Sequence, residues 1–233
     1  MTSTISRVVV VIPARDEEDT LAECLASVKQ AAHSVSVPTT IVLVLDSCTD
    51  RSGEIAASFA DVIVVEGEFA SVGLARASGF SHALASCAED PDGIWFAATD
   101  ADSVVPSGWL VEHLRAAREG AHVYAGAVVP VLQDLDAERQ REWMRTHPPG
   151  ATLGHVHGAN LGMRGSAYIA AGGFSCLATG EDVELVARLR ELGMPFVESE
   201  AHPVVTSSRL TGRARDGYAK YLTDLTTPLA SSL

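Results

Sequence analysis

The segment "RVVVVIPA" (7–14) decides how the chain is interpreted, because its apolar residues form a continuous run rather than an alternating one. A strand covered by helices on both faces has this pattern, whereas a half-exposed strand alternates polar and apolar residues. Three more short runs of this kind follow: "TTIVLVLD" (39–46), "DVIVVE" (61–66) and "GIWFAAT" (93–99). The repetition predicts the strands of one mainly parallel sheet.

The segments between these runs have helical patterns. After the first run, apolar residues recur at helical spacing at Leu21, Cys24, Leu25 and Val28. "GLARASGFSHALASCA" (73–88) follows the third run, and "PSGWLVEHLRAARE" (106–119) follows the fourth with a proline suited to a first helical turn. Alternating strands and helices predict an α/β fold with right-handed crossovers, in which ligands bind at the carboxyl ends of the strands.

Composition limits the classes of protein to consider. The chain has 233 residues, 47% of them hydrophobic, and a net charge of -13. This size and apolar content suit one large domain, and the negative charge argues against nucleic acid or an anionic membrane surface as a partner. The four cysteines show no C-x-x-C pair, and no apolar stretch approaches about 18 residues. We therefore expect a cytoplasmic protein without a transmembrane segment.

The spacing Asp-x-Asp occurs three times, at 90/92, 100/102 and 134/136. The first pair precedes the fourth strand and predicts a turn, and the last predicts a helix start. Only Asp100 and Asp102 follow a predicted strand, at the sheet edge that Glu17 and Asp46 also occupy. A divalent cation would offset the repulsion between these two carboxylates, and a solvated turn is the alternative.

Six motifs in this order resemble the family 2 glycosyltransferases of the GT-A fold, from about residue 7 to about residue 213. They are "VIPARDEE" (11–18), "VLVLDSCTDRS" (42–52), "SVGLARASG" (71–79), "TDADSVVPSGWL" (99–110), "HGANLGMRGSAYIAAGGF" (157–174) and "TGEDVELVARLRELG" (179–193). The chain departs from the family pattern at Asp16 and Ala77, where asparagine is usual, and its second motif is one residue shorter. The resemblance implies a Rossmann-like sheet flanked by helices, with a smaller acceptor-side region.

The resemblance also implies roles for individual residues. The expected nucleotide-sugar contacts are Pro13, Arg15, Glu17, Asp46, Arg76, Asp100, Arg209 and Arg213. Mg²⁺ or Mn²⁺ would be bound by Asp102 and by His202, which we place after a short late strand. Asp182, with Glu181 beside it, is the expected general base. An ordinary helix start with acids in its first turn is the alternative for these two residues.

The implied function is transfer of a hexosyl group, by inversion, from a nucleotide sugar to an acceptor hydroxyl, with UDP-sugar favoured. The acceptor is a small molecule, a lipid-linked molecule or a glycan. We expect one GT-A domain, with a nucleotide-sugar half to about residue 105, an acceptor half from about 106 to 213, and a C-terminal tail over 214–233.

Several alternatives stay open from the residues alone. A nucleotidyltransferase would share the nucleotide half and the metal, and a non-catalytic nucleotide-sugar binding module would explain the departures from the family motifs. His155 and His157 are either a metal pair or satisfied polar positions. Trp95, Phe96 and Trp109 are predicted to be core residues rather than sugar platforms.

Overall fold

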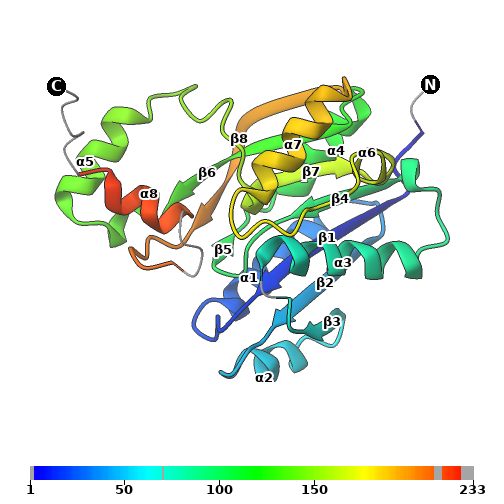
Figure 1. Cartoon of the computed structure of the whole chain (residues 1–233), viewed down its shortest axis with the longest axis horizontal. Helices are drawn as coiled ribbons and strands as arrows, with labels where there is room; N and C mark the ends of the chain where they lie inside the picture. The colour runs from blue at the N-terminus through cyan, green and yellow to red at the C-terminus, as the bar shows by residue number, and fades with distance from the viewer. Residues whose placement is uncertain (1–2, 70, 213–216, 227–233) are drawn as a thin grey trace.

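The structure is a computed structural model that describes residues 3–69, 71–212 and 217–226. Its centre is one sheet, eight-stranded within these ranges, with the order β3-β2-β1-β4-β7-β6-β8-β5 (Figure 1). The strands are β1 (Arg7–Ala14), β2 (Thr39–Asp46), β3 (Val62–Gly67), β4 (Ile94–Ala98), β5 (Ser103–Val104), β6 (Val123–Pro130), β7 (Leu161–Arg164) and β8 (Phe196–Thr206). The helices are α1 (Leu21–His33), α2 (Ser52–Ala57), α3 (Val72–Ser86), α4 (Trp109–Arg118), α5 (Ala137–Thr146), α6 (Gly165–Ala170), α7 (Glu181–Glu191) and α8 (Tyr218–Asp224), with short 3₁₀ turns η1 (Pro91–Gly93), η2 (Leu132–Asp134) and η3 (Gly158–Asn160).

The four predicted strands form the parallel part of the sheet. β1 pairs in parallel with β2 and β4, and β2 pairs in parallel with β3. The other part is mixed, because β7 runs antiparallel to both β4 and β6, whereas β8 is parallel to β6 and antiparallel to β5. The carboxyl ends of β1, β2 and β4 therefore meet at one edge, as the sequence predicts.

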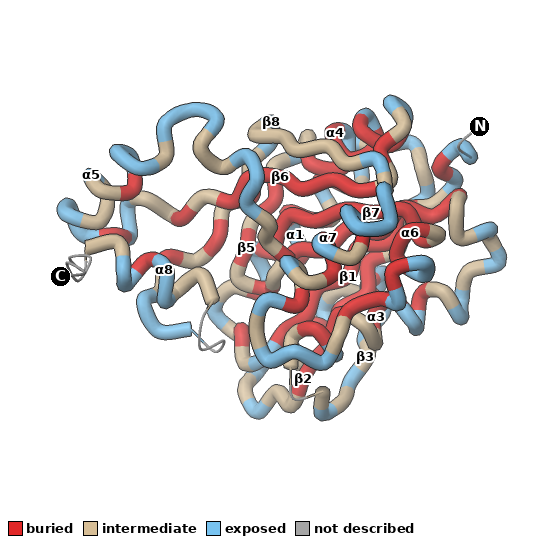
Figure 2. Tube along the Cα trace, turned by 45° about the horizontal axis from the view of Figure 1, so that its top comes forward, coloured by how far each residue is buried: buried red, intermediate tan, exposed pale blue. Residues whose placement is uncertain are grey.

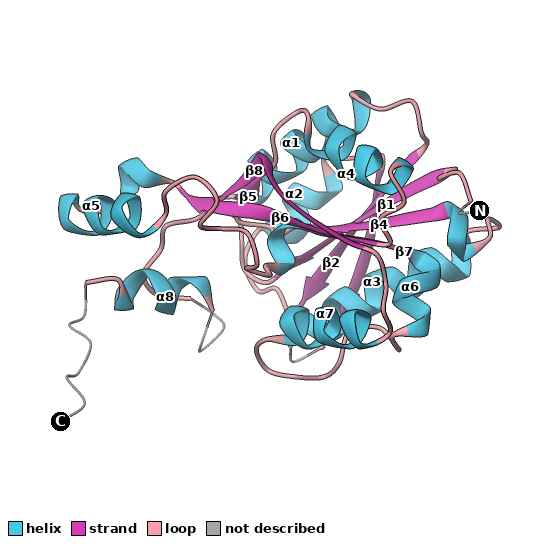
Figure 3. Ribbon diagram, turned by 90° about the horizontal axis from the view of Figure 1, so that it is seen from above, coloured by secondary structure: helices cyan, strands magenta, loops and turns pink. Residues whose placement is uncertain are grey.

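The sheet separates two hydrophobic cores. Val8, Val10 and Ile12 of β1 join the core that includes α1 and α4, whereas Val9 and Val11 join the core that includes α3, α6 and α7. Successive strand residues point to opposite faces, so the continuous apolar run fills both cores. Figure 3 shows helices on both faces of the sheet, and Figure 2 shows the central strands as buried.

The aromatic residues of the fourth strand and the following helix belong to these cores. Trp95, Phe96 and Trp109 have no exposed surface, which confirms that they are core residues. The other two Asp-x-Asp pairs are also as predicted: Asp90 accepts a hydrogen bond from Asp92 N within a turn, and Asp136 caps α5.

Helices α5 and α8 form a small lobe beyond the end of β6 and β8 (Figure 3). Residues 218–224, which the sequence places in a tail, form α8 and pack against α5 through Leu222, Trp143 and Leu135. Arg139 Nε of α5 also donates to Leu222 O at 3.1 Å. Of the helices in the described part of the chain, none combines the length and apolar character that a bilayer span requires.

A buried polar network joins α4 to the sheet. Trp95 Nε1 donates to His113 Nδ1 at 3.1 Å, so His113 Nε2 carries the proton and donates to Asn160 Oδ1 at 3.3 Å. Trp109 Nε1 donates to the same Asn160 oxygen at 2.8 Å. Burial lowers the pKa of His113 to about 4, against the hydrogen bond to Asn160, which raises it. The neutral imidazole is therefore the form that the fold stabilises.

This network predicts a specific loss of stability in acid. The folded-state pKa of His113 lies below its ordinary value of 6.5, so its contribution is complete above pH 6.5 and is lost as pH falls towards 4. The shift corresponds to about 3 kcal/mol over that window. Chemical unfolding at several pH values measures the free energy of unfolding across this window. His113→Gln is the matched variant, and its free energy of unfolding should fall less than that of the wild type as pH falls from 6.5 to 4. Equal pH slopes for the two proteins would show that His113 does not contribute.

Candidate active site

A cavity of about 530 Å³ lies at the carboxyl edge of the parallel strands. Its lining comes from the loops after β1, β2 and β4, from the starts of α3 and α7, and from the segments after β8. Most residues of the predicted site line it: Pro13, Arg15, Glu17, Asp46, Arg76, Asp100, Asp102, Glu181, Asp182 and Arg209. Arg213 lies outside the described residues.

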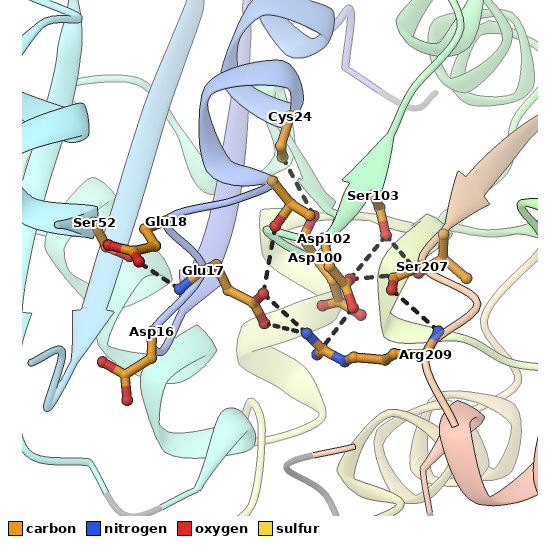
Figure 4. Close-up of polar contacts among 12 residues, drawn as sticks. Asp16, Glu17, Glu18, Cys24, Ser52, Asp100, Asp102, Ser103, Ser207 and Arg209 are labelled. Atoms are coloured by element: carbon orange, nitrogen blue, oxygen red, sulfur yellow. Dashed lines mark hydrogen bonds and ion pairs between the residues drawn. The ribbon is translucent and has the colours of Figure 1, made fainter. Parts of the chain in front are cut away.

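Arg209, which follows β8, binds two of the predicted acids at once (Figure 4). Its Nη1 contacts both carboxylate oxygens of Glu17 at 3.0 and 2.9 Å, and its Nη2 contacts Asp102 Oδ2 at 3.0 Å. The Glu17 and Asp102 side chains are only 10% and 12% exposed. One guanidinium therefore offsets part of the negative charge at the ends of β1 and β4 together.

Asp100 and Asp102 lie on a turn after β4 rather than on the strand itself, because β4 ends at Ala98. Asp102 Oδ1 is also within reach of the hydroxyls of Ser103, at 3.3 Å, and Thr206, at 3.4 Å. Burial and the charge of Asp100 raise the pKa of Asp102, and Arg209 opposes them. The pair is thus held beside positive groups, as the repulsion between the two carboxylates requires.

Arg76 of α3 is a buried residue that lines the cavity. It donates from Nη2 to Asp100 Oδ1 and from Nη1 to Glu181 Oε1, and its guanidinium lies 5.7 Å from the centre of the Phe174 ring. Burial alone would lower the pKa of Arg76, but the charges of Asp100 and Glu181 raise it. A Cβ at Gly158 would lie 2.4 Å from Arg76 Nη2, so a larger side chain there would displace the guanidinium. Arg76 therefore links the two halves of the predicted site.

Asp182 lies at the start of α7, after Gly180 in the left-handed region with φ 75°. Asp182 Oδ2 accepts a hydrogen bond from Gly158 N at 2.6 Å, and Oδ1 accepts one from Val183 N at 2.8 Å. The neighbouring Glu181 is buried, which raises its pKa, and is paired with Arg76. Of the two expected catalytic acids, Asp182 is the one whose carboxylate is not paired with an arginine in the described structure.

Asp46 ends β2 with its side chain at the cavity. Its Oδ1 accepts hydrogen bonds from Phe69 N at 2.8 Å and from Ser47 Oγ at 3.0 Å. These contacts hold the segment after β3 against the end of β2. Asp46 thus shapes the cavity wall as well as lining it.

His202 is not among the residues that line the cavity. It lies within β8, which continues to Thr206, and not after a short strand as expected. Its backbone has a φ of 56°, close to a register irregularity between β6 and β8. Its ring lies over Gly108 before α4, since a Cβ at Gly108 would be 2.3 Å from the ring. The ring thus lies next to the start of α4, and the expected partnership with Asp102 in metal binding stays a prediction.

A second acidic group lies outside the cavity. Asp16, Cys48 and Asp50 are the one set of three potential metal-ligating side chains found close together among the described residues. Asp16 Oδ1 accepts from Thr49 N at 2.7 Å, and Asp50 accepts from Ser52 N and Glu18 N. These bonds tie the loops after β1 and β2 together. The aspartate at 16 suits its left-handed backbone, with φ 51°.

Oxygen donors at the cavity edge fit Mg²⁺ or Mn²⁺. Hard cations prefer carboxylate oxygens, and they bind nucleotides through few protein ligands. Asp102 supplies such an oxygen to the cavity, and a cation bound there would share or replace the guanidinium of Arg209 as its partner. We take Asp102 as the residue that would hold the ion.

Three aromatic side chains outside the predicted set of site residues also line the cavity. His157 lines the cavity from the loop before η3, not from a strand, and Tyr218 and Tyr221 line it from α8. The two tyrosines are three residues apart, a spacing that places them on one face of a helix. This spacing is the signal in the sequence that could have identified the two tyrosines as neighbours on one helix face.

Comparisons with known proteins agree with this architecture. Residues 9–172 match the family model described as Glycosyl transferase family 2. The solved structure of S. aureus TarS 1-349 in complex with UDP-GlcNAc is 13% identical with a TM-score of 0.66, over 91% of this chain and 61% of that one. The mannosyltransferase PcManGT from Pyrobaculum calidifontis, in complex with GDP-Man and Mn²⁺, is 18% identical with a TM-score of 0.58, over 88% and 57%.

The chain thus spans about three fifths of the length of these solved structures, and the likeness to them concerns the fold. A comparison with proteins of curated function finds no match. The family model covers well over half of the 233 residues, including the motifs at the ends of β1, β2 and β4. The chain therefore belongs to glycosyl transferase family 2 and has the GT-A fold.

Proposed function

We propose that this enzyme transfers a sugar from a nucleoside-diphosphate sugar to an acceptor hydroxyl, with a UDP-sugar as the favoured donor and inversion at the anomeric carbon. The observation that carries the proposal is that Asp102, Arg209 and Asp182 line one cavity. Donor and acceptor must approach to about 3–3.5 Å for transfer, so groups suited to each belong together. The solved complex of TarS with UDP-GlcNAc supports UDP as the nucleotide.

The charge of the cavity supports a donor that arrives with a cation. Its described lining contains six carboxylates and three arginines. A nucleoside diphosphate adds negative charge, so it needs positive partners here. Bound Mg²⁺ or Mn²⁺ would supply them at Asp102 by neutralising the departing diphosphate as a Lewis acid. Arg209 would add a guanidinium, whose planar fork suits phosphate oxygens.

The transfer breaks the bond between the anomeric carbon and the diphosphate oxygen, and the electron pair leaves with the diphosphate. The acceptor oxygen forms the new bond to that carbon from the opposite side, which inverts its configuration. The acceptor's proton passes to a carboxylate, for which we propose Asp182. The hydrogen bonds from Gly158 N and Val183 N would fix the direction of its oxygens.

We also propose a division of the single domain into a donor half, to about residue 105, and an acceptor half, from about 106 to 213. Arg76 supports this division, because it pairs with Asp100 from the first half and Glu181 from the second. The pairing would hold the donor site and the base at a fixed separation.

A thermal-shift screen tests the proposed function. We expect UDP or a UDP-sugar with Mn²⁺, at about 100 times its Kd, to raise Tm by about 5–10 °C, because a ligand of the folded state adds about 2.7 kcal/mol under these conditions. GDP and ADP with their sugars are the comparison set, and uridine, which lacks phosphate, is the control. No shift with any nucleoside diphosphate, with or without Mn²⁺, would overturn the proposal.

A further inference from the structure

Two of the arginines that line the cavity differ in how far the protein encloses them. The Arg76 side chain is 3% exposed, and its guanidinium is enclosed between its two carboxylate partners. The Arg209 side chain is 34% exposed where it lies between Glu17 and Asp102 (Figure 4). Partly exposed ion pairs are held weakly, so Arg209 is able to exchange its partners for a ligand that enters the cavity.

The Asp102 carboxylate is held in place by groups other than Arg209. Its Oδ1 lies 3.4 Å from the Thr206 hydroxyl, which accepts a hydrogen bond from Ser103 Oγ at 2.9 Å. Ser103 and Thr206 are partners in the β5–β8 pairing, and Ser207 N donates to the Asp102 backbone oxygen at 3.1 Å. If the guanidinium moved away, Asp102 would keep its direction, and its Oδ2 would remain as a ligand for a cation.

The chain on either side of Arg209 is also anchored. Ser208 Oγ donates to Val131 O at 2.8 Å, and Leu210 O accepts a hydrogen bond from Thr223 Oγ1 of α8 at 3.1 Å. These contacts hold the backbone around residue 209 while the guanidinium moves by rotation about its side-chain bonds. The ion pairs of the guanidinium are therefore the contacts that an exchange breaks.

The charges at this position favour such an exchange when a nucleotide arrives together with the cation. Two carboxylates, those of Glu17 and Asp102, contact one guanidinium here. A divalent cation bound to Asp102 beside Arg209 would leave a surplus of positive charge, and the two would repel each other. A nucleoside diphosphate removes this surplus, and its phosphate oxygens are new bidentate partners for the guanidinium.

We propose that Arg209 holds the place of the cation at Asp102 until the donor binds, and that it then exchanges Asp102 for the diphosphate of the donor. The guanidinium and the cation would share the same carboxylate oxygen, Oδ2, so each excludes the other from it. The inference rests on the proposed function and deepens it, because it makes cation binding depend on the nucleotide. By linkage, the cation and the nucleotide raise each other's affinity.

Titration with Mn²⁺ alone tests this inference, with free Mn²⁺ measured by electron paramagnetic resonance. Arg209→Gln should bind Mn²⁺ about tenfold more tightly than the wild type, because the competing positive charge is gone. In saturating UDP this gain should disappear, because the wild-type guanidinium then lies at the diphosphate and no longer competes. The measurement requires no turnover of a donor.

Arg145→Gln is the matched control, because it removes the same charge from the whole protein. Arg145 pairs with Glu142 on α5 and is not among the described residues that line the cavity. Its Mn²⁺ affinity should equal that of the wild type. Mn²⁺ binding by Arg209→Gln that is no tighter than by the wild type would overturn the inference, as would a gain that persists unchanged in saturating UDP.

Folding of the variant gives a second measurement. Without the guanidinium, Glu17 and Asp102 repel each other, so Arg209→Gln should have a lower Tm than the wild type in metal-free buffer. Mn²⁺ should raise the Tm of Arg209→Gln by more than it raises that of the wild type. A variant that stays unfolded with and without Mn²⁺ would overturn the inference, because Arg209 would then be required for the fold itself.

Failure of this inference and failure of the proposed function give different results. If the inference alone fails, UDP with Mn²⁺ still binds the wild type, but Mn²⁺ alone binds Arg209→Gln no more tightly. If the proposed function fails, the wild type binds no nucleoside diphosphate at all.

Discussion

Replacing Asp182 with asparagine should lower kcat by about 10²- to 10⁴-fold, the usual contribution of a general base, and leave donor affinity unchanged. Asparagine has nearly the same shape and keeps one acceptor oxygen for Gly158 N or Val183 N, but it cannot take the acceptor's proton. Single-turnover transfer and donor titration measure the two quantities separately.

Glu184→Gln is the matched control for this experiment. Glu184 also lies in the first turn of α7, but it pairs with Arg188 and does not line the cavity. Its kcat should equal that of the wild type. Full activity in Asp182→Asn would contradict the assignment, because the other expected catalytic acid, Glu181, is buried and paired with Arg76.

The sequence predicted the parallel part of the fold well, because its strands are covered on both faces. The expected strands at 7–14 and 39–46 match β1 and β2, and those at 61–66 and 93–99 differ from β3 and β4 by one residue at either end. A continuous apolar run identifies a buried strand from local sequence, without knowledge of the strand that it pairs with. The carboxyl-edge position of Glu17, Asp46 and Asp100 followed from strand order alone, and all three line the cavity.

The other part of the fold was less predictable for physical reasons. β5 has two residues, and its pairing with β8 joins segments about a hundred residues apart, so no local pattern marks it. The register irregularity between Gly126 and Val128 lies opposite the part of β8 that contains His202, and a register shift of this kind depends on the partner strand. α8 is short and is stabilised by packing against α5 rather than by its own sequence.

The ion pairs of the two arginines could not be predicted from the sequence either. Arg209 and Glu17 are 192 residues apart, and Arg76 and Glu181 are 105 apart. Their residue types indicated phosphate or nucleotide contacts, but not that each would bind two carboxylates. Long-range ion pairs depend on where chain segments meet in space, which local periodicity does not specify.

The second large effect concerns Asp102, which we propose as the residue that holds the cation. Asp102→Asn removes the charge that binds Arg209 Nη2 at 3.0 Å and that would bind Mg²⁺ or Mn²⁺. Removing the carboxylate that would ligate the cation costs about 2–5 kcal/mol of binding free energy, so UDP in the presence of Mn²⁺ should bind about 10²-fold more weakly. Donor turnover should fall with it.

The most direct test of this donor site is therefore calorimetric titration of UDP in Mn²⁺ into three proteins: the wild type, Asp102→Asn and Asp134→Asn. Asp134 is exposed, belongs to another Asp-x-Asp pair and does not line the cavity. We predict unchanged affinity in Asp134→Asn and a loss of about 10²-fold in Asp102→Asn. Equal affinity in all three proteins would contradict the assignment of this edge of the sheet as the cation and diphosphate site.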